Sequence, residues 1–352
     1  MRFALIACLS LCACGGLTSH GNGGGSASGG GSAAGGGAAT GGGSASGGGK
    51  ASGGGSASGG GSGTGGGSTR TDCNHALGDG HHVTAPAQHP FAGIRAMQFD
   101  AQGNLYVLNW QQSAGKSYLS MFAPAPNRGF LNATPDGVLK AGQDFAFDGA
   151  GDTYVLDFDP SVDSSPTVVM LDALGSKLKS FSTNTSDGDG IFYDTDGTLL
   201  VSAAWLVRLD TDGGLVGGPY GGMPNFTPFF TGIARDTSGL LWAGELNDNV
   251  LVSFDASMNR LGSIGGRGSG PGQFDGTSMY HEAPERFAFD AQGNLYAADP
   301  GNGRVMKLST TGDMLGSFDF GGSDNIGAIA VDPLTGNVLV SRTSAIDVIC
   351  AL

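Results

Sequence analysis

The sequence predicts an all-β domain built from six similar units, over residues 70–352. A short Asp-containing motif recurs six times, and apolar β-prone runs of four to seven residues flank it. Helix signals are nearly absent, and each unit of about 45 residues has room for four strands. Four antiparallel strands per 40–50 residues is the period of a blade in a β-propeller. We therefore expect a six-bladed β-propeller.

The recurring motif predicts the hairpin between the first two strands of each unit. An apolar or aromatic residue precedes Asp, two or three loop residues follow, and Gly comes next, before a small or polar residue and a short run such as Leu-Tyr-Val. Asp caps a turn of this kind, and Gly accepts the positive φ that the turn requires. The aspartates are 42 to 54 residues apart: Asp100, Asp148, Asp194, Asp236, Asp290 and Asp332.

The outer two strands are readable in the later units. The fourth unit offers residues 250–254 and 260–264, and the fifth offers 304–308 and 314–318. The sixth unit offers strands near 326–331, 337–341 and 345–349, after which it lacks a fourth strand.

The segment before the first unit, residues 72–86, has no unit of its own. We expect it to supply the outer strand of the last blade, which joins the two ends of the domain. This arrangement places Cys73 beside Cys350. A pair of cysteines in an exported protein favours a disulfide, whereas two free thiols are the alternative.

The first residues predict export. Met1-Arg2 is followed by a short apolar run, as in a signal peptide over residues 1–13. Leu11-Cys12-Ala13-Cys14 resembles the lipobox of bacterial lipoproteins. The resemblance implies cleavage before Cys14 and lipidation of that residue. Cys12 is the competing site, and a plain secretory signal is the alternative.

Residues 14–69 are expected to be the lipidated cysteine and a disordered linker. A GGGSAS-like unit repeats through this stretch, which holds 28 of the 67 glycines and no unit with a large apolar side chain. The lipobox resemblance implies a chain anchored to the bacterial envelope. In a Gram-negative cell it implies the outer membrane, because no Asp follows Cys14.

The charge balance excludes several partners. The chain has 17 basic and 31 acidic residues and a formal net charge of −14. Phosphate contacts need Lys and Arg, so we expect no nucleic-acid binding and no polybasic membrane surface. Contact with a membrane is then expected through the lipid anchor only, and we expect a monomer.

Two stretches resemble an NHL repeat. These are residues 265–274, GGRGSGPGQF, and residues 287–299, FAFDAQGNLYAAD, followed by Asn302-Gly-Arg304-Val305. The match is partial in the first and sixth units, so YWTD-type and lactonase-type propellers stay open. The resemblance implies a binding or scaffold module for an envelope protein, a glycan or a small ligand.

The insertion at residues 265–286 is the first candidate site. In NHL repeats this stretch crosses the ring to the next inner strand, which implies that its side chains reach the channel mouth. A His beside carboxylates and Arg suits acid–base work or recognition of a polar ligand. A crossover loop whose charges face water is the alternative. The ligand-binding candidates are Arg267, Tyr280, His281, Glu282 and Arg286.

A metal-dependent propeller enzyme, lactonase-like or lyase-like with a site at the axial channel, is the alternative function. Only His281 lies inside the six units, three Glu exist in the chain, and no G-x-S-x-G motif is present. We therefore assign no catalytic residue and no metal ligand, and we predict no cofactor. Of the two interpretations, an enzyme is the less favoured.

Two further stretches have alternative interpretations. Asp187-Gly-Asp189-Gly and Asp194-Thr-Asp196-Gly resemble fragments of calcium loops, but neither continues to the Glu that an EF-hand requires. Turn chemistry is the better account, and calcium stays an alternative. Aromatic residues between 225 and 230 either anchor a partner or pack between blades.

Overall fold

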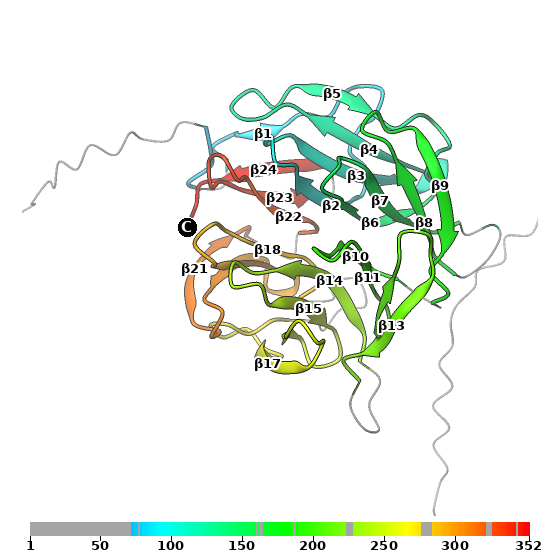
Figure 1. The fold of residues 1–352 in the computed structure, drawn as a ribbon. Helices are drawn as coiled ribbons and strands as arrows, with labels where there is room; N and C mark the ends of the chain where they lie inside the picture. Colours follow the sequence, from blue (N-terminus) through cyan, green and yellow to red (C-terminus); the bar gives the residue numbers. More distant parts are fainter. Residues whose placement is uncertain are drawn as a thin grey trace, which may run out of the picture. The chain divides into compact units, whose positions relative to one another are not determined.

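The computed structural model describes residues 72–76, 78–159, 161, 165–185, 188–222, 228–275, 284–321, 326–342 and 344–352. They form six four-stranded antiparallel sheets arranged around a central axis (Figure 1). The predicted all-β, six-bladed fold with four strands per blade is confirmed. The predicted signal peptide, Cys14 and linker lie outside the described residues. Among the described residues, no helix has the length and apolar character that a membrane crossing requires.

Each blade runs from an inner strand at the axis to an outer strand at the rim. Blade 1 contains β2 (Ile94–Phe99), β3 (Leu105–Gln111), β4 (Lys116–Phe122) and β5 (Phe130–Ala133). Blade 2 contains β6 (Gly142–Phe147), β7 (Thr153–Asp157), β8 (Thr167–Leu171) and β9 (Lys177–Ser182). Blade 3 contains β10 (Gly190–Tyr193), β11 (Leu199–Ser202), β12 (Leu206–Leu209) and β13 (Leu215–Tyr220).

The second half of the ring repeats this order. Blade 4 contains β14 (Phe230–Arg235), β15 (Leu241–Glu245), β16 (Val250–Phe254) and β17 (Arg260–Gly265). Blade 5 contains β18 (Phe287–Phe289), β19 (Leu295–Asp299), β20 (Arg304–Leu308) and β21 (Met314–Asp319). Blade 6 contains β22 (Ile329–Val331), β23 (Val338–Arg342), β24 (Ala345–Ile349) and β1 (His82–Val83). Two short 3₁₀ turns, η1 (Gln112–Ala114) and η2 (Pro300–Asn302), follow β3 and β19.

The six Asp-Gly motifs form the hairpins that the sequence predicts. The glycine after each motif Asp has a φ between 72° and 100°, where a Cβ is unfavourable. In each hairpin the backbone N–H of the Asp donates to the carbonyl of the residue after that glycine, at 2.8 to 3.1 Å. In blade 5, Asp290 Oδ1 also accepts the N–H groups of Gln292 and Asn294. These hairpins all lie on one side of the ring, which we call the hairpin face.

The hydrophobic core lies between the blades. Six clusters of buried side chains occur in the described residues, and each joins two neighbouring blades. The cluster between blades 2 and 3, for example, combines Leu156 and Val168 with Ile191 and Leu199. A single four-stranded blade has no closed core, so each sheet depends on both neighbours for burial of its apolar faces.

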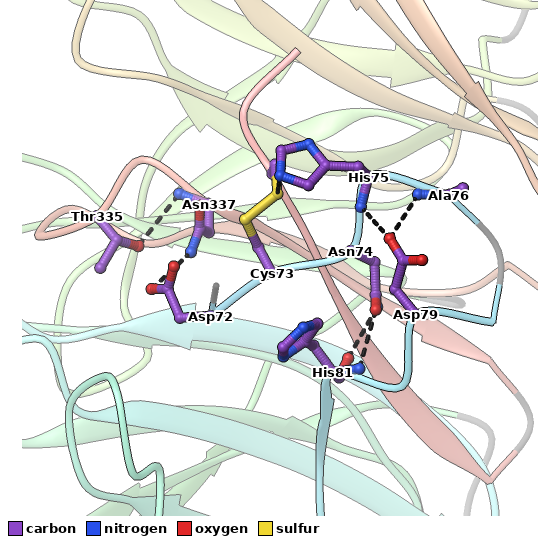
Figure 2. The surroundings of a disulfide bond; sticks show 10 residues. Asp72, Cys73, Asn74, His75, Ala76, Asp79, His81, Thr335 and Asn337 are labelled. Carbon is purple, nitrogen blue, oxygen red and sulfur yellow. Dashed lines mark hydrogen bonds between the residues drawn. A yellow bond between two sulfur atoms is a disulfide. The ribbon is translucent and has the colours of Figure 1, made fainter. Parts of the chain in front are cut away.

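Blade 6 closes the ring with strands from both ends of the domain. β1 pairs antiparallel with β24, and Cys73 forms a disulfide with Cys350, with 5.0 Å between the Cα atoms (Figure 2). The side chain of Asn74 accepts the N–H of His81 and donates to its carbonyl, which orders the approach to β1. The predicted N-terminal closure and the predicted disulfide are both confirmed.

A buried ion pair joins blade 1 to blade 6 on the hairpin face. Arg128 follows β4, and its Nη2 lies 2.5 Å from Asp332 Oδ2, with both side chains almost fully buried. The same guanidinium lies over the ring of Phe99 in β2, at 5.5 Å. The junction between the first and last blades is therefore fixed by a disulfide, a strand pair and an ion pair.

A polar side chain occupies the end of the second strand in every blade, on the side opposite the hairpin face. All six are at most 4% exposed: Asn109, Asp157, Ser202, Glu245, Asp299 and Ser341. Asn109 and Asp157 accept backbone N–H groups from the segment that enters their blade. Glu245 instead accepts N–H groups from the loop after its own strand. These residues order backbone that the strands themselves do not pair.

We predict that the disulfide contributes strongly to stability. It encloses a separation of 277 residues, so it removes much conformational freedom from the unfolded chain. The double variant Cys73→Ser/Cys350→Ser is expected to lower the free energy of unfolding by about 2–5 kcal/mol, measured by urea denaturation. Wild-type protein kept in reductant serves as the control and should match the variant. Equal stability of oxidised and reduced protein would contradict the prediction.

We also predict that Asp157 makes stability depend on pH. Burial raises the pKa of Asp157 from 3.8 to about 6, although N–H groups of Lys140 and Ala141 oppose the shift. The pKa of Asp157 in the folded protein therefore lies above its pKa in the unfolded chain. For this reason its contribution to the free energy of unfolding falls as the pH rises from about 4 to about 6. A shift of about two pKa units corresponds to a change of roughly 3 kcal/mol in the free energy of unfolding.

Asp157→Asn should remove this fall, because Asn109 satisfies the same contacts at the equivalent position of blade 1. Urea denaturation between pH 4 and pH 7 should show equal stability at pH 4 and a gain for the variant at pH 7. Asp299→Asn is the matched control and should lose stability at pH 7, since Asp299 pairs with Arg304 at 2.8 Å. An unaltered pH profile for Asp157→Asn would refute the assignment.

Candidate functional site: the axial cavity

The position four residues before each motif Asp forms a layer around the axis, near the start of the inner strands. We call this set the axial layer. Four of its members are Gly or Ala, whereas blade 2 contributes an Asp and blade 5 an Arg. The six residues are Ala96, Asp144, Gly190, Gly232, Arg286 and Ala328. Blades 2 and 5 are opposite one another in a six-membered ring, so the two charged members face across the axis between small neighbours.

Arg286 spans the axis from blade 5 to blades 2 and 3. Its Nη2 donates to the carbonyl of Gln143 and its Nη1 to the carbonyl of Asp189, each at 3.1 Å. Nη1 also lies 3.6 Å from Asp144 Oδ2. Glu285 Oε1 lies 3.4 Å from Nη2. The residue is 8% exposed, and its Nε is buried without a hydrogen-bond partner among the described residues.

The backbone before Arg286 is fixed against blade 4. The N–H of Gly232 donates to the carbonyl of Glu285 at 3.1 Å, and Thr231 Oγ1 donates to the carbonyl of Pro284 at 3.2 Å. A Cβ at position 232 would lie 2.5 Å from the Glu285 carbonyl oxygen. Glycine at 232 therefore permits the close approach that directs Arg286 toward the axis.

The surroundings shift the pKa values of both Asp144 and Arg286. Burial raises the pKa of the Asp144 carboxyl, and the positive charge of Arg286 opposes this only in part. Burial acts to lower the pKa of Arg286, but the carboxylates of Asp144, Glu285 and Asp189 outweigh it and raise the pKa. Arg286 is therefore a permanent cation.

A cavity of about 530 Å³ extends along the axis from this pair. Its walls are mostly small or apolar, with Phe192 and Gln98 as larger members of the next layer. The residues two positions before each motif Asp contribute most of that layer: Gln98, Phe192, Ala234, Ala288 and Ala330. An apolar cavity of this volume that ends in a few converging polar groups has the usual form of a small-molecule site.

The cavity opens at the hairpin face. Lining residues at that end, Ala101 and Pro333, are exposed, whereas Ala96 and Ala328 at the other end are at most 3% exposed. Arg286 and Asp144 are also buried at that inner end. Within the described residues, the charged pair therefore forms the closed end of the cavity.

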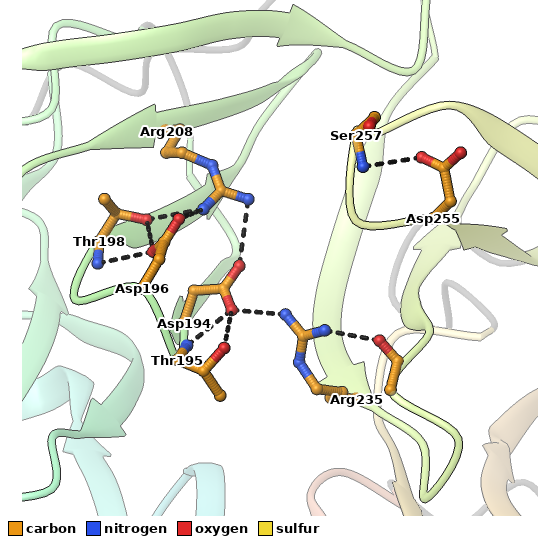
Figure 3. A network of polar contacts seen from close by, with 9 residues as sticks. Asp194, Thr195, Asp196, Thr198, Arg208, Arg235, Asp255 and Ser257 are labelled. Atoms are coloured by element: carbon orange, nitrogen blue, oxygen red, sulfur yellow. Dashed lines mark hydrogen bonds and ion pairs between the residues drawn. The ribbon is translucent and has the colours of Figure 1, made fainter.

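Arg235 lies at the mouth and is held by blade 3 (Figure 3). Its Nη2 lies 2.5 Å from Asp194 Oδ1, and its guanidinium lies over the Phe192 ring at 5.6 Å. Arg208 approaches the other oxygen of Asp194 at 3.1 Å and pairs with Asp196 at 2.5 Å. The network fixes the side chain of Arg235 beside the opening.

The sequence-predicted site residues are only partly placed. Arg286 lies at the closed end of the cavity, as the expected crossing of the ring implies. Arg267 is exposed and is not among the lining residues. Tyr280, His281 and Glu282 lie outside the described residues. The described structure therefore does not bring the five candidates together.

Asp144, Phe192 and Arg235 are cavity residues that the sequence analysis did not identify. A signal for Asp144 was present, because the alignment of the six motifs places it in register with Arg286, where the other units have Gly or Ala. A charged residue at a position otherwise occupied by the smallest side chains indicates a special role.

Other candidate groups have different surroundings. Asp194 and Asp196, considered for calcium, pair with the arginines at 208 and 235, whose positive charge opposes a cation. Phe230 is fully buried and packs edge-to-face on Phe254, which supports packing rather than partner contact there.

A cluster of His75 with the two cysteines does not offer a metal site in the oxidised protein. His75 Nε2 lies 3.2 Å from Cys350 Sγ, and the three potential ligand atoms are within 4.8 Å of one another. The two sulfurs, however, are bonded to each other, and metal binding by cysteine needs thiolates. In the part of the chain that the structure describes, no histidine lines the axial cavity.

Comparison with known proteins supports the fold. No protein-family model matches the chain. No curated protein sequence matches it. Among solved structures, an auxiliary nutrient binding protein from Bacteroides thetaiotaomicron is similar with a TM-score of 0.54 and 13% identity, over 74% of this chain and 70% of that one.

Two other solved structures are similar with slightly lower TM-scores. A catalytically inactive virginiamycin B lyase from Staphylococcus aureus, with quinupristin, gives a TM-score of 0.51 at 13% identity, covering 76% of this chain and 87% of that one. The β-propeller domain of Cps50 (Swd1) from Myceliophteria thermophila gives a TM-score of 0.51 at 13% identity, covering 73% of this chain and 96% of that one. At such low identity these similarities establish a six-bladed β-propeller and no particular activity.

We predict that the pair at the closed end is coupled energetically. Arg286→Met should lower the free energy of unfolding by about 3–5 kcal/mol, because it leaves Asp144 buried without its partner. Asp144→Leu combined with Arg286→Met should recover part of this loss, as an apolar replacement of a buried pair often does. Urea denaturation of the single and double variants measures the coupling.

The surface pair Lys179–Asp212 provides the control for this cycle. Its atoms are 2.5 Å apart, but the side chains are 38% and 84% exposed. Lys179→Met should therefore change stability by no more than about 1 kcal/mol. Additive effects of the Asp144 and Arg286 substitutions would show that the two residues do not interact.

Proposed function

We propose that this protein is an exported binding module, whose propeller holds a small ligand in the axial cavity. The observation that carries the proposal is the apolar cavity of about 530 Å³ with the buried Arg286–Asp144 pair at its closed end. A central channel is common to β-propellers, and the buried charged pair at one end is what gives this cavity the form of a binding site.

The lining favours reversible binding over catalysis. Ten of the 21 described lining residues are alanine or phenylalanine, and five have polar or charged side chains: Gln98, Asp100, Asp144, Arg235 and Arg286. Arg286 is held by two carbonyls and two carboxylates, which suits a fixed recognition surface better than a group that exchanges protons. The similarity to propellers named as a lyase and as a nutrient binding protein is compatible with both roles.

We further propose that the NHL-like propeller is tethered to the bacterial envelope. The lipobox-like residues before Cys14 and the glycine-rich linker support this location. On this proposal the linker is a flexible spacer between the lipid anchor and the ligand-binding domain.

The binding proposal is tested with N-phenyl-1-naphthylamine, an uncharged aromatic probe whose fluorescence increases in apolar surroundings. Saturable binding of one probe per chain is expected. Ala234→Phe and Ala288→Phe narrow the cavity at half-buried positions and should each weaken binding at least tenfold. Ala256→Phe, in an exposed outer hairpin, is the matched control and should bind as wild type does. Equal binding by all variants would remove the cavity from the proposal.

A further inference from the structure

The closed end of the cavity offers one hydrogen-bond donor that nothing in the described protein uses. Arg286 is more than nine-tenths buried and lines the cavity, and its Nε–H has no partner among the described residues. A buried donor without an acceptor is costly, so an acceptor beyond the described residues is expected to meet it, and a ligand in the cavity can supply one. The ligand should therefore present a hydrogen-bond acceptor at this end.

Asp144 offers the complementary capacity. Its Oδ2 accepts the N–H of Ile191 at 3.1 Å, and a carboxylate has about four lone-pair directions, so further bonds are available to it. A ligand whose polar group both accepts and donates can therefore bond to Arg286 and Asp144 together.

The charges around Arg286 indicate that the head of the ligand, meaning the polar group that meets Arg286 and Asp144, is uncharged. Two carboxylates, from Asp144 and Glu285, lie within 3.6 Å of this one guanidinium. Asp189 adds a third acid, and Arg95 a second cation that burial disfavours. Among the described residues, the cluster therefore has no excess positive charge for an anion, while the guanidinium at the contact point opposes a cation.

The wall beyond the pair suits a flat apolar body. Phe192 is the aromatic member of the layer next to the pair, and the alanines at 234, 288 and 330 leave space opposite it. Phe99 and Phe289 line the cavity nearer to the hairpin face. Aromatic side chains favour planar partners at offset or edge-to-face contact.

We propose that the axial cavity binds an uncharged aromatic molecule whose amide or hydroxyl head meets Arg286 and Asp144 at the closed end. The ligand enters from the hairpin face, past Arg235. This inference rests on the proposed function and adds the chemical class of the ligand and its orientation.

The test compares three probes that share a ring and differ in the head: benzamide, benzoate and benzylamine. Each competes with bound N-phenyl-1-naphthylamine at pH 7, and calorimetry measures direct binding. Benzamide is expected to bind at least tenfold more tightly than either charged probe. Arg286→Lys keeps the charge but removes the Nε–H, so it should weaken benzamide at least tenfold.

A second variant keeps the test independent of folding at the buried pair. Glu285 is 38% exposed, and Glu285→Gln removes one negative charge beside Arg286. The affinity for benzoate relative to that for benzamide should then rise severalfold. Asp212→Asn makes the same charge change at a remote, 84% exposed site and should alter neither probe.

The outcomes separate the two proposals. If the naphthylamine probe binds but benzoate or benzylamine equals benzamide, the head-group inference is wrong and the ligand-binding function stands. If the naphthylamine probe and benzamide both fail to bind, both proposals are wrong. A gain in benzoate affinity with Asp212→Asn as large as with Glu285→Gln would also overturn the assigned orientation.

Discussion

The closed ring depends on apolar contact between neighbouring sheets. None of the six blades buries its faces alone, and every cluster of buried side chains in the described residues belongs to two blades. Such a structure is stable only when the first and last blades also meet, since an open end would expose a complete apolar face to water. The disulfide, the pairing of β1 with β24 and the Arg128–Asp332 pair all act at that junction.

Packing of this kind leaves the axis as the one place where six strands converge without a partner sheet. Small residues at four positions of the axial layer allow the inner strands to approach, and they also give Arg286 room to extend to the opposite blade. The cavity and its charged end thus follow from the same geometry that stabilises the ring. Arg286 links blade 5 to blades 2 and 3, so the candidate site is continuous with the scaffold.

Local chemistry made the fold predictable from sequence. Asp290 and Gly293 specify a hairpin within a few residues. The strands expected at 250–254, 304–308 and 345–349 agree with β16, β20 and β24. The disulfide followed from counting strands in the last unit. The candidate site was harder to predict from the sequence. Asp144 and Arg286 are 142 residues apart in the chain and become neighbours only when the six blades close into a ring. Arg286 was found through the NHL resemblance, and Asp144 required the register of all six motifs.

The polar residues near the ends of the second strands make the six units of this domain unequal. Asn109, Asp157, Ser202, Glu245, Asp299 and Ser341 differ in length, charge and bonding direction, although they occupy equivalent places. Several are matched to the particular backbone beside them, as Asp299 is to the N–H of Asp275 and Asp157 to the entry of blade 2. An exchange of two blades would leave a carboxylate or an amide facing the wrong loop, deep inside the protein. The units are thus alike in outline but no longer interchangeable, and the order of blades is itself part of what the sequence encodes.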